Sequence, residues 1–285
     1  MIRLSLLLAF FVTIAACSTR ERQTAPGFDG GLPTDSGVAV DMARPPVDAS
    51  TDNTIVYAHS ARTLYAFDPR TNLVTAIGDF HLAGGGDLGS MTDLAINQAG
   101  IIYTSSADAI FTVNPVNALV TQIATLTVPD GVQFNGLTFV PVGVLDPSSE
   151  VLVGAAGDGS YYRINLTTGN SVLVGHYSNN YVSSGDLVSV EGAGTFAAVK
   201  LTSGMANDVL VRVNPATGAT TRIGDIGYRQ VFGLAYWRNR VYGFTTRGEL
   251  LLINIDTGAG TLVTNSTGAE QFYGAGVTTI APILF

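Results

Sequence analysis

A 14-residue motif recurs five times along this chain of 285 residues, and no other feature of the sequence limits the fold as strongly. In the copy VRVNPATGATTRIG (Val211–Gly224), alternating apolar residues lead into a turn, and a threonine-rich stretch follows it. Asn214 supplies a side-chain acceptor, Pro215 presets φ, and Gly218 takes the positive φ of a type I turn with a bulge. The motif therefore predicts a β-hairpin. The other copies are YAFDPRTNLVTAIG (Tyr65–Gly78), FTVNPVNALVTQIA (Phe111–Ala124), YRINLTTGNSVLVG (Tyr162–Gly175) and LLINIDTGAGTLVT (Leu251–Thr264).

Two further strand-like stretches precede each of the last four hairpins, so the repeating unit is longer than the hairpin itself. In the final unit they are Gly233-Leu234-Ala235 and Val241-Tyr242-Gly243. The fourth residues of successive motifs lie 46, 51, 49 and 40 residues apart. Units of four short strands with a period of 40–51 residues are typical of β-propellers. We therefore predict an all-β fold, a five-bladed β-propeller whose blades are four-stranded antiparallel sheets.

The two ends of the repeat region complement one another. Before the first hairpin there is room for a single strand, Thr54–Ala58, because a segment rich in Pro and Gly precedes it. After the last hairpin, Phe272–Ile280 has the character of an innermost strand and no hairpin of its own. We expect this C-terminal strand to join blade one, which closes the ring and leaves no unpaired edge there.

The repeats resemble the L-Y-x-I-D/N-P-x-T-G-x-x-T-x-I-G motif of uncharacterised bacterial β-propeller lipoproteins. The resemblance covers Thr54–Ile280 and implies the propeller fold. It implies no catalytic residues, because the shared positions belong to strands and turns. Asn72 and Ala118 replace the usual glycine of the motif, and Leu166 and Ile255 replace the usual proline.

The N-terminus has the pattern of an export signal. A short positive start is followed by Leu4–Ile14, an apolar run shorter than the ~20 residues that a membrane-spanning helix needs. The next residues, Ile14-Ala15-Ala16-Cys17, resemble the lipobox of bacterial lipoproteins. The resemblance implies cleavage of a signal peptide, residues 1–16, and acylation of Cys17. Ser18, and not Asp, follows the cysteine. In lipoproteins of enteric bacteria this residue favours sorting to the outer membrane, which we therefore expect here, with the periplasmic or surface side left open.

Residues 17–53, the lipidated cysteine and the segment after it, are rich in Pro, Gly and Asp. Such a composition buries too little apolar surface to offset its ordering entropy, so we predict a disordered tether. The propeller domain, residues 54–285, holds ten basic and sixteen acidic side chains, a net charge of −6. This charge argues against nucleic acid as a partner, and we expect contact with the membrane only through the lipid. Cys17 is the only cysteine, so no internal disulfide can form. We also expect the protein to be a monomer.

Loops that gather on one side of a propeller, around the mouth of its channel, are the expected place for a ligand. We name the four strands of a blade A to D, from the innermost to the outermost. The loops in question are the D–A loops, which connect one blade to the next, and the B–C loops, which connect the two middle strands of a blade. Tyr and Arg dominate interface energetics, which directs attention to these residue types. The candidate ligand-binding residues are His59, Arg62, Tyr177, Asn180, Tyr181, Tyr228, Arg229 and Arg247. The lone Trp237, at the end of an inner strand, is expected in the core.

Carboxylates and an amide are expected near the mouth of the channel. They are Asp87, Asp93, Asn135, Asp158 and Asp186. Such oxygens could hold Ca²⁺, although no motif requires a cofactor and we expect none. Paired carboxylates could also hydrolyse a glycosidic bond, but no motif marks one of them as an acid of raised pKa. Hydrogen bonding to loop amides is the simplest role for these side chains.

These features favour a non-enzymatic function for a lipid-anchored protein of the cell envelope. We expect its loops to bind a protein, a peptide or a glycan, or to serve as a scaffold. Two alternatives remain open: a glycoside hydrolase or lyase-like enzyme that uses the channel carboxylates, and a structural spacer with a metal ion in the channel. Two carboxylates about 5–9.5 Å apart in an open cleft would indicate a hydrolase.

Overall fold

The structure is a computed structural model that describes residues 52, 54–204 and 207–284. The predicted signal peptide, Cys17 and all of the predicted tether except Asp52 lie outside these residues. Within the described part of the chain, no helix is long and apolar enough to cross a membrane. All described residues fall in one compact unit.

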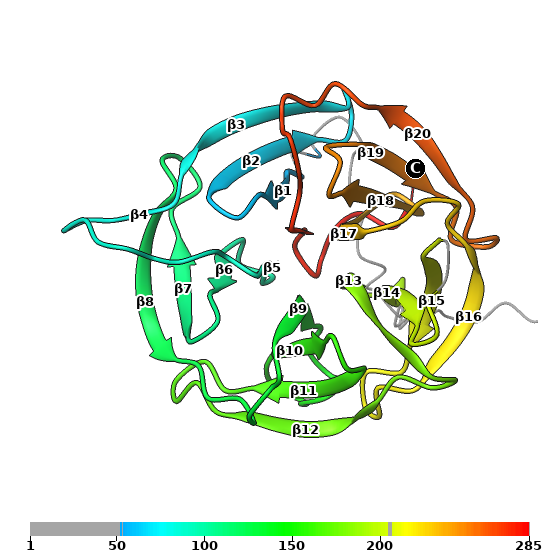
Figure 1. Ribbon diagram of the computed structural model, residues 1–285, viewed down its shortest axis with the longest axis horizontal. Coiled ribbons are helices and arrows are strands. Elements are labelled where there is room, and N and C mark those ends of the chain that lie inside the picture. Colours follow the sequence, from blue (N-terminus) through cyan, green and yellow to red (C-terminus); the bar gives the residue numbers. More distant parts are fainter. Residues whose placement is uncertain (1–51, 53, 205–206, 285) are drawn as a thin grey trace, which may run out of the picture. The chain divides into compact units, whose positions relative to one another are not determined.

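Five sheets surround a central axis in sequence order, as Figure 1 shows. Each contains four antiparallel strands, here named A to D from the innermost to the outermost, which confirms the predicted five-bladed propeller. In addition, β4 (His81–Leu82) pairs with β8 in parallel at the outer edge of blade two. The strands of blades one to five are β21 (Gly274–Gly276), β1 (Val56–His59), β2 (Thr63–Asp68) and β3 (Leu73–Asp79); β5 (Asp93–Ile96), β6 (Ile102–Ser105), β7 (Ala109–Val113) and β8 (Leu119–Thr125); β9 (Phe134–Val140), β10 (Val151–Ala156), β11 (Ser160–Ile164) and β12 (Ser171–His176); β13 (Tyr181–Val190), β14 (Gly194–Leu201), β15 (Val209–Val213) and β16 (Thr220–Asp225); and β17 (Val231–Trp237), β18 (Arg240–Thr245), β19 (Leu250–Ile253) and β20 (Gly260–Thr264).

The C-terminal strand closes the ring, as predicted. β21 pairs antiparallel with β1, and Ala58 faces Ala275 in the register. Just before β21, the buried ring of Phe272 lies 5.5 Å from the ring of Tyr65 and 5.2 Å from that of Phe244, measured between centroids. These edge-to-face contacts connect the closing segment to blades one and five.

The five hairpins have the turn chemistry that their motif indicates. In each turn, the opening Asn or Asp side chain accepts a hydrogen bond from the backbone N–H two residues later, as Asn214 does from Ala216 at 2.9 Å. The residue at the glycine position is left-handed in every copy, with φ between 59° and 78°. Asn72 and Ala118 adopt this conformation too, so the two departures from the glycine keep the backbone of the turn.

The final glycine of the motif makes room for the next blade. A Cβ at Gly224 would lie 1.9 Å from the carbonyl oxygen of Thr257, in the C–D turn of blade five. One blade earlier, a Cβ at Gly175 would lie 2.0 Å from the carbonyl oxygen of Thr217. The C–D turns of these blades therefore pack directly against the outer strand of the preceding blade. The repeat thus encodes the contact between blades as well as the hairpin.

Asp52 attaches the N-terminal edge of the described domain to blade five. Its carboxylate accepts hydrogen bonds from the Trp237 indole at 2.8 Å and from the Thr54 backbone N–H at 3.0 Å. Arg238 pairs with the same carboxylate at 3.3 Å and lies over the Trp237 ring, 4.7 Å from its centroid. Trp237 is buried, as predicted. Asp52 is buried as well and belongs to the folded domain, although it lies within the predicted tether.

Candidate functional site

Three ionisable side chains meet inside the ring, close to its axis. His59 ends β1, Asp93 begins β5 and Asp186 lies within β13. All three side chains are completely buried. The expectation that Asp93 and Asp186 open at the mouth of the channel is therefore wrong, because the surrounding strands seal them from solvent.

Backbone N–H groups from three blades hold Asp186. The donors and their distances are Leu187 in blade four at 2.6 Å, Leu234 in blade five at 2.7 Å and Ala275 in blade one at 3.2 Å. Both carboxylate oxygens are used, because Leu187 donates to Oδ1 and the other two residues donate to Oδ2. An ionised carboxylate only accepts hydrogen bonds, so this set of donors favours a charge on Asp186.

Asp93 extends this connection to the remaining blades. It belongs to blade two, and its Oδ2 accepts a short hydrogen bond from the backbone N–H of Leu137 in blade three. The carboxyl groups of Asp93 and Asp186 also share a side-chain hydrogen bond. The aspartate pair therefore links all five blades around the axis.

The aspartate pair retains a proton. Burial raises the pKa of Asp93 well above its usual value, and the neighbouring Asp186 raises it further. Burial also raises the pKa of Asp186, but its hydrogen bonds from Asp93 and from the backbone favour its charged form. Because two touching carboxyl groups cannot readily both ionise away from water, one proton stays between them. The donor sets assign this proton to Asp93, which donates it to Asp186.

His59 faces the aspartate pair as a neutral imidazole. Its Nδ1 lies 2.7 Å from the carbonyl oxygen of Ser60, which can only accept, so Nδ1 carries the hydrogen. Nε2 lies 3.7 Å from Asp93 Oδ1, beyond hydrogen-bond distance, and has no hydrogen-bond partner among the described residues. Burial lowers the pKa of His59 to about 4, which keeps the ring uncharged at neutral pH.

A glycine of the closing strand completes the cluster. A Cβ at Gly274 would lie 1.9 Å from Asp93 Oδ1 and 2.5 Å from His59 Nε2, so no other residue fits there without displacing them. The five corresponding positions of the inner strands are Asp93, Gly136, Asp186, Gly233 and Gly274. Two carboxyl groups and three glycines therefore fill the space that five side chains could not.

The last described segment covers the axis on the side of the A–B turns. The Thr278 hydroxyl donates to the Asn97 carbonyl of blade two at 3.0 Å. The Glu191 N–H of blade four donates to the Thr279 carbonyl at 2.8 Å, and blade five donates to the carbonyl of Pro282 at 2.7 Å. The C-terminal segment thus bridges several blades at the end of the axis opposite the loops.

Three of the predicted ligand-binding residues are buried. His59 belongs to the axial cluster, and Tyr177 and Tyr181 pack in the core shared by blades three and four. The Tyr177 backbone N–H donates to the Gly159 carbonyl at 2.8 Å, which folds this D–A loop onto blade three. The expectation that these three side chains line an accessible surface is wrong.

The other predicted ligand-binding residues remain on the loop side of the ring. Tyr228 is half-buried, and the exposed ones are Arg62, Asn180, Arg229 and Arg247. Arg229 and Arg247 lie on neighbouring loops, which are joined by two hydrogen bonds between Thr246 and Gln230. The backbone N–H of Thr246 donates to the Gln230 carbonyl at 3.1 Å, and the Thr246 hydroxyl donates to the side-chain oxygen at 2.9 Å.

The remaining channel-mouth candidates are engaged by their own loops. Asp87 is exposed and accepts a hydrogen bond from the Gly89 N–H at 2.9 Å. Asp158 is exposed as well and accepts from the N–H and hydroxyl of Ser160. Partial burial opposes ionisation of Asp158, but the Ser160 bonds outweigh it and keep its pKa below the usual value. Asn135 is half-buried.

Across the described chain, no group of three or more His, Cys, Asp or Glu side chains is arranged to hold a metal ion.

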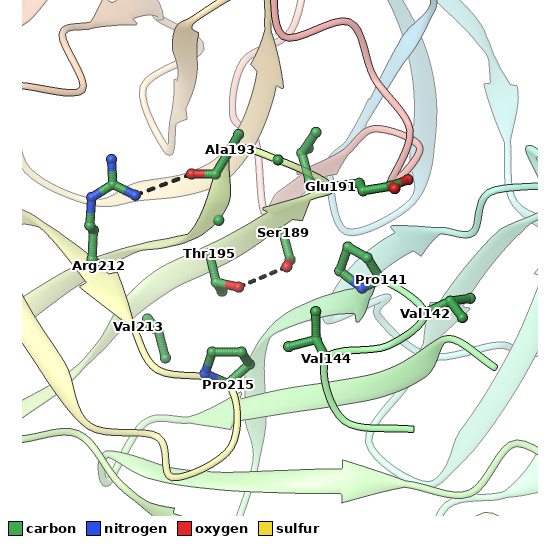
Figure 2. A pocket seen from close by; sticks show the side chains of 13 residues that line it. Pro141, Val142, Val144, Ser189, Glu191, Ala193, Thr195, Arg212, Val213 and Pro215 are labelled. Carbon is green, nitrogen blue, oxygen red and sulfur yellow. Dashed lines mark hydrogen bonds between the residues drawn. The ribbon is translucent and has the colours of Figure 1, made fainter. Parts of the chain in front are cut away.

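Three cavities lie on the side of the A–B and C–D turns, away from the predicted loop side. One of about 420 Å³ lies between blades three and four, where the A–B segments of both blades meet the C strand of blade four (Figure 2). One of about 690 Å³ lies along blade three, and one of about 310 Å³ lies between blades five and one. The sequence gives little sign of the first cavity, because its lining is mostly valine, proline and glycine from separate repeats.

No protein-family model matches the chain, and no curated protein matches it. Solved structures that resemble it include a protein of unknown function from Bacteroides caccae, 10% identical over 77% of each chain, with a TM-score of 0.42. The PQQ-bound form of aldose sugar dehydrogenase from Streptomyces coelicolor is 15% identical over 78% of this chain and 80% of that chain, with a TM-score of 0.46. A symmetrical protein described as a case of de novo evolutionary emergence is 15% identical over 81% of this chain and 100% of that chain, also with a TM-score of 0.46.

Proposed function

We propose that this protein is a non-enzymatic binding or scaffold module, held at the cell envelope by a lipid on Cys17, whose loop side binds a protein, a peptide or a glycan. The observation that carries the proposal is the contrast between a sealed axis and an open loop side. The side chains of Asp93, Asp186 and His59, whose pKa values are shifted by burial, are out of reach of solvent. The accessible loops instead present arginine and amide side chains, which suit recognition of a partner.

Arg229 and Arg247 form the centre of the proposed surface. Their loops are held together by the Thr246–Gln230 hydrogen bonds, so less conformational entropy is lost when a partner binds. The loop of Arg229 is also attached to blade four, because the Asp208 N–H donates to the Tyr228 carbonyl at 2.7 Å. Arginine and tyrosine are the residue types that most often anchor interfaces.

The arrangement of the carboxylates favours binding over glycoside hydrolysis. A hydrolase needs two carboxylates on either side of a substrate in an open cleft. Asp93 and Asp186 contact each other and backbone N–H groups, and the exposed Asp87 and Asp158 accept hydrogen bonds within their own loops. The arrangement also favours binding over a spacer with a metal ion in the channel, because both oxygens of Asp186 already accept hydrogen bonds from backbone N–H groups.

Charge reversal of Arg229 and Arg247 on the loop side is expected to abolish capture of the partner without unfolding the protein. Full-length protein is immobilised and exposed to a cell-envelope extract and, separately, to a glycan array. We expect the Arg229→Glu/Arg247→Glu variant to retain less than about a tenth of the captured ligand, because two anchors become repulsive. The melting temperature should stay within about 2 °C of the wild type, since both side chains are exposed.

Arg163→Glu/Arg222→Glu provides a matched control. It makes the same change in charge at two exposed strand residues, on β11 and β16, that belong to neither type of loop. This variant should capture as much ligand as the wild type. Loss of capture in the control together with full capture by the loop variant would move the binding surface away from the loops.

The membrane anchor is predicted to depend on Cys17. The Cys17→Ser substitution removes the thiol that acylation requires, so we expect the protein to move from the detergent phase to the aqueous phase in a phase-separation assay. Incorporation of a labelled fatty acid should be lost in the same variant. A serine variant that still partitions with membranes would contradict the lipid anchor and leave the proposal for the loop side unaffected.

A further inference from the structure

The cavity between blades three and four has an apolar wall that opens to solvent. Pro141, Val142 and Val144, from the A–B segment of blade three, form this wall, and Pro215 also lines the cavity (Figure 2). Val142 and Val144 are 39% and 49% exposed, so aliphatic surface is available to a ligand. The volume of about 420 Å³ lies within the range of about 300–1,000 Å³ that is usual for ligand sites.

Arg212 supplies one oriented cation at the rim of this cavity. One of its guanidinium N–H groups donates to the Ala193 carbonyl at 3.1 Å, and the guanidinium lies 4.6 Å from the centroid of the Phe196 ring. Among the described residues, Arg212 forms no ion pair. Figure 2 shows Glu191 on the far side of Ala193, away from the guanidinium. The group is therefore fixed in position while its charge is left for a ligand.

The other blades show that the fold itself does not require this arrangement. The residues at the position of Arg212 in blades one, two, three and five are Ala66, Thr112, Arg163 and Leu252. Arg163 is the other arginine, but it pairs across the strands with Val153, whereas Arg212 pairs with the aromatic Phe196. At this strand position, an arginine paired with an aromatic ring therefore occurs in blade four alone among the five blades.

We propose that this cavity binds the C-terminal end of a peptide, with the α-carboxylate on Arg212 and an aliphatic last side chain against the wall of Pro141, Val142 and Val144. The planar guanidinium presents its N–H donors as a fork that matches a carboxylate. An aliphatic side chain that packs on the wall removes apolar surface of both partners from water, which lowers the free energy of the complex. This site lies on the opposite side of the ring from the loops, so it is separate from the function proposed above.

A labelled tetrapeptide tests both contacts. Fluorescein-Gly-Gly-Val-Leu is titrated into the full-length protein as the free acid and as the C-terminal amide, with fluorescence polarisation as the readout. We expect the amide to bind at least about tenfold more weakly than the acid. Arg212→Ala should weaken binding of the acid by the same factor, and amidation should have no further effect in that variant, because the two changes remove one contact. Val144→Asp should weaken both peptides, since it places a charge in the apolar wall.

Arg163→Ala is the matched control, because it removes an exposed arginine from the same strand position in blade three. It should change the affinity for the acid less than about twofold. Equal affinity of the wild type for acid and amide would overturn the carboxylate contact with Arg212. Equal weakening by Arg163→Ala and Arg212→Ala, or no saturable binding of the acid up to about 1 mM, would overturn the site.

Discussion

Truncation after Gly268 is expected to abolish cooperative unfolding of the propeller. It removes β21 and the buried Phe272, which together connect blade one to blade five. It also removes the Ala275 N–H that donates to Asp186 at the axis. No other described strand pairs with the inner edge of β1, so the truncation leaves this edge unpaired and exposed. Thermal unfolding followed by circular dichroism should show a broad transition at low temperature, or none.

Truncation after Ile283 is the control for this experiment. It removes Leu284, whose side chain is 78% exposed, and the final residue. This shorter truncation should melt within about 2 °C of the full chain. A Gly268 truncation that unfolds cooperatively at the parent temperature would show that the ring does not depend on its C-terminal strand.

Asp186→Asn is expected to destabilise the fold by about 3 kcal/mol, because both oxygens of Asp186 accept backbone hydrogen bonds. A carboxamide offers one oxygen acceptor, and its NH₂ group can only donate. At least one buried N–H among those of Leu187, Leu234 and Ala275 would then face another donor. Urea unfolding of the full-length variant measures the loss as a change in the free energy of unfolding.

Asp93→Asn should cost less than about 1 kcal/mol, although the two aspartates are equally buried. The carboxamide mimics the protonated carboxyl group that the structure assigns to Asp93. Its oxygen can keep the hydrogen bond from Leu137, and its N–H can donate to Asp186 as the shared proton does. Equal losses for the two substitutions, or the larger loss for Asp93→Asn, would contradict this placement of the proton.

The axial cluster also determines how stability changes with pH. The folded-state pKa of Asp93 is raised above its value of 3.8 in the unfolded chain, so the folded protein holds a proton that the unfolded chain has released. The contribution of the aspartate pair is therefore complete below pH 3.8 and is lost as pH rises through the folded-state pKa. The pKa of His59 is lowered from 6.5 to about 4, so its contribution is complete above pH 6.5 and is lost as pH falls.

These two effects oppose each other as pH rises from about 4 towards 6.5. Because His59 is present in both proteins, we expect the free energy of unfolding of the wild type to decline relative to Asp93→Asn as pH rises above 3.8. The decline should reach up to about 1.4 kcal/mol per pH unit until the folded-state pKa of Asp93 is passed. Urea unfolding of both proteins across this range measures the difference. Parallel curves for the wild type and Asp93→Asn would show that Asp93 does not hold the proton.

The fold could be predicted from the sequence because each copy of the motif specifies its own local structure. The turn residues fix the hairpins, the period fixes the number of strands, and the incomplete units at the two ends fix the closure. The contact of the motif glycine with the next blade could not be predicted, since the motif does not show that the C–D turn of one blade meets the outer strand of another. That contact depends on the twist of the assembled blades.

The site was harder to predict, because burial depends on contacts between different repeats. The spacing placed Asp93 and Asp186 near the axis, but it could not show that their side chains meet there and connect all five blades. The sequence predicts a first B strand that ends at Ala58, one residue too early, and therefore places His59 in a loop. Tyr177 and Tyr181 are buried by a loop that folds back onto blade three, and no local pattern in the sequence indicates this contact.

Comparing ligand capture by two variants of the full-length protein tests most directly whether the loop side binds the partner. Asp93→Asn changes the buried axis and leaves the surface as it is, whereas Arg229→Glu/Arg247→Glu changes the loop side alone. If the loops bind the partner, Asp93→Asn should capture as much ligand as the wild type, and the loop variant should capture less than about a tenth of that amount. Wild-type capture by the loop variant, with loss of capture in a fully folded Asp93→Asn protein, would contradict the account and assign the function to the axial pair.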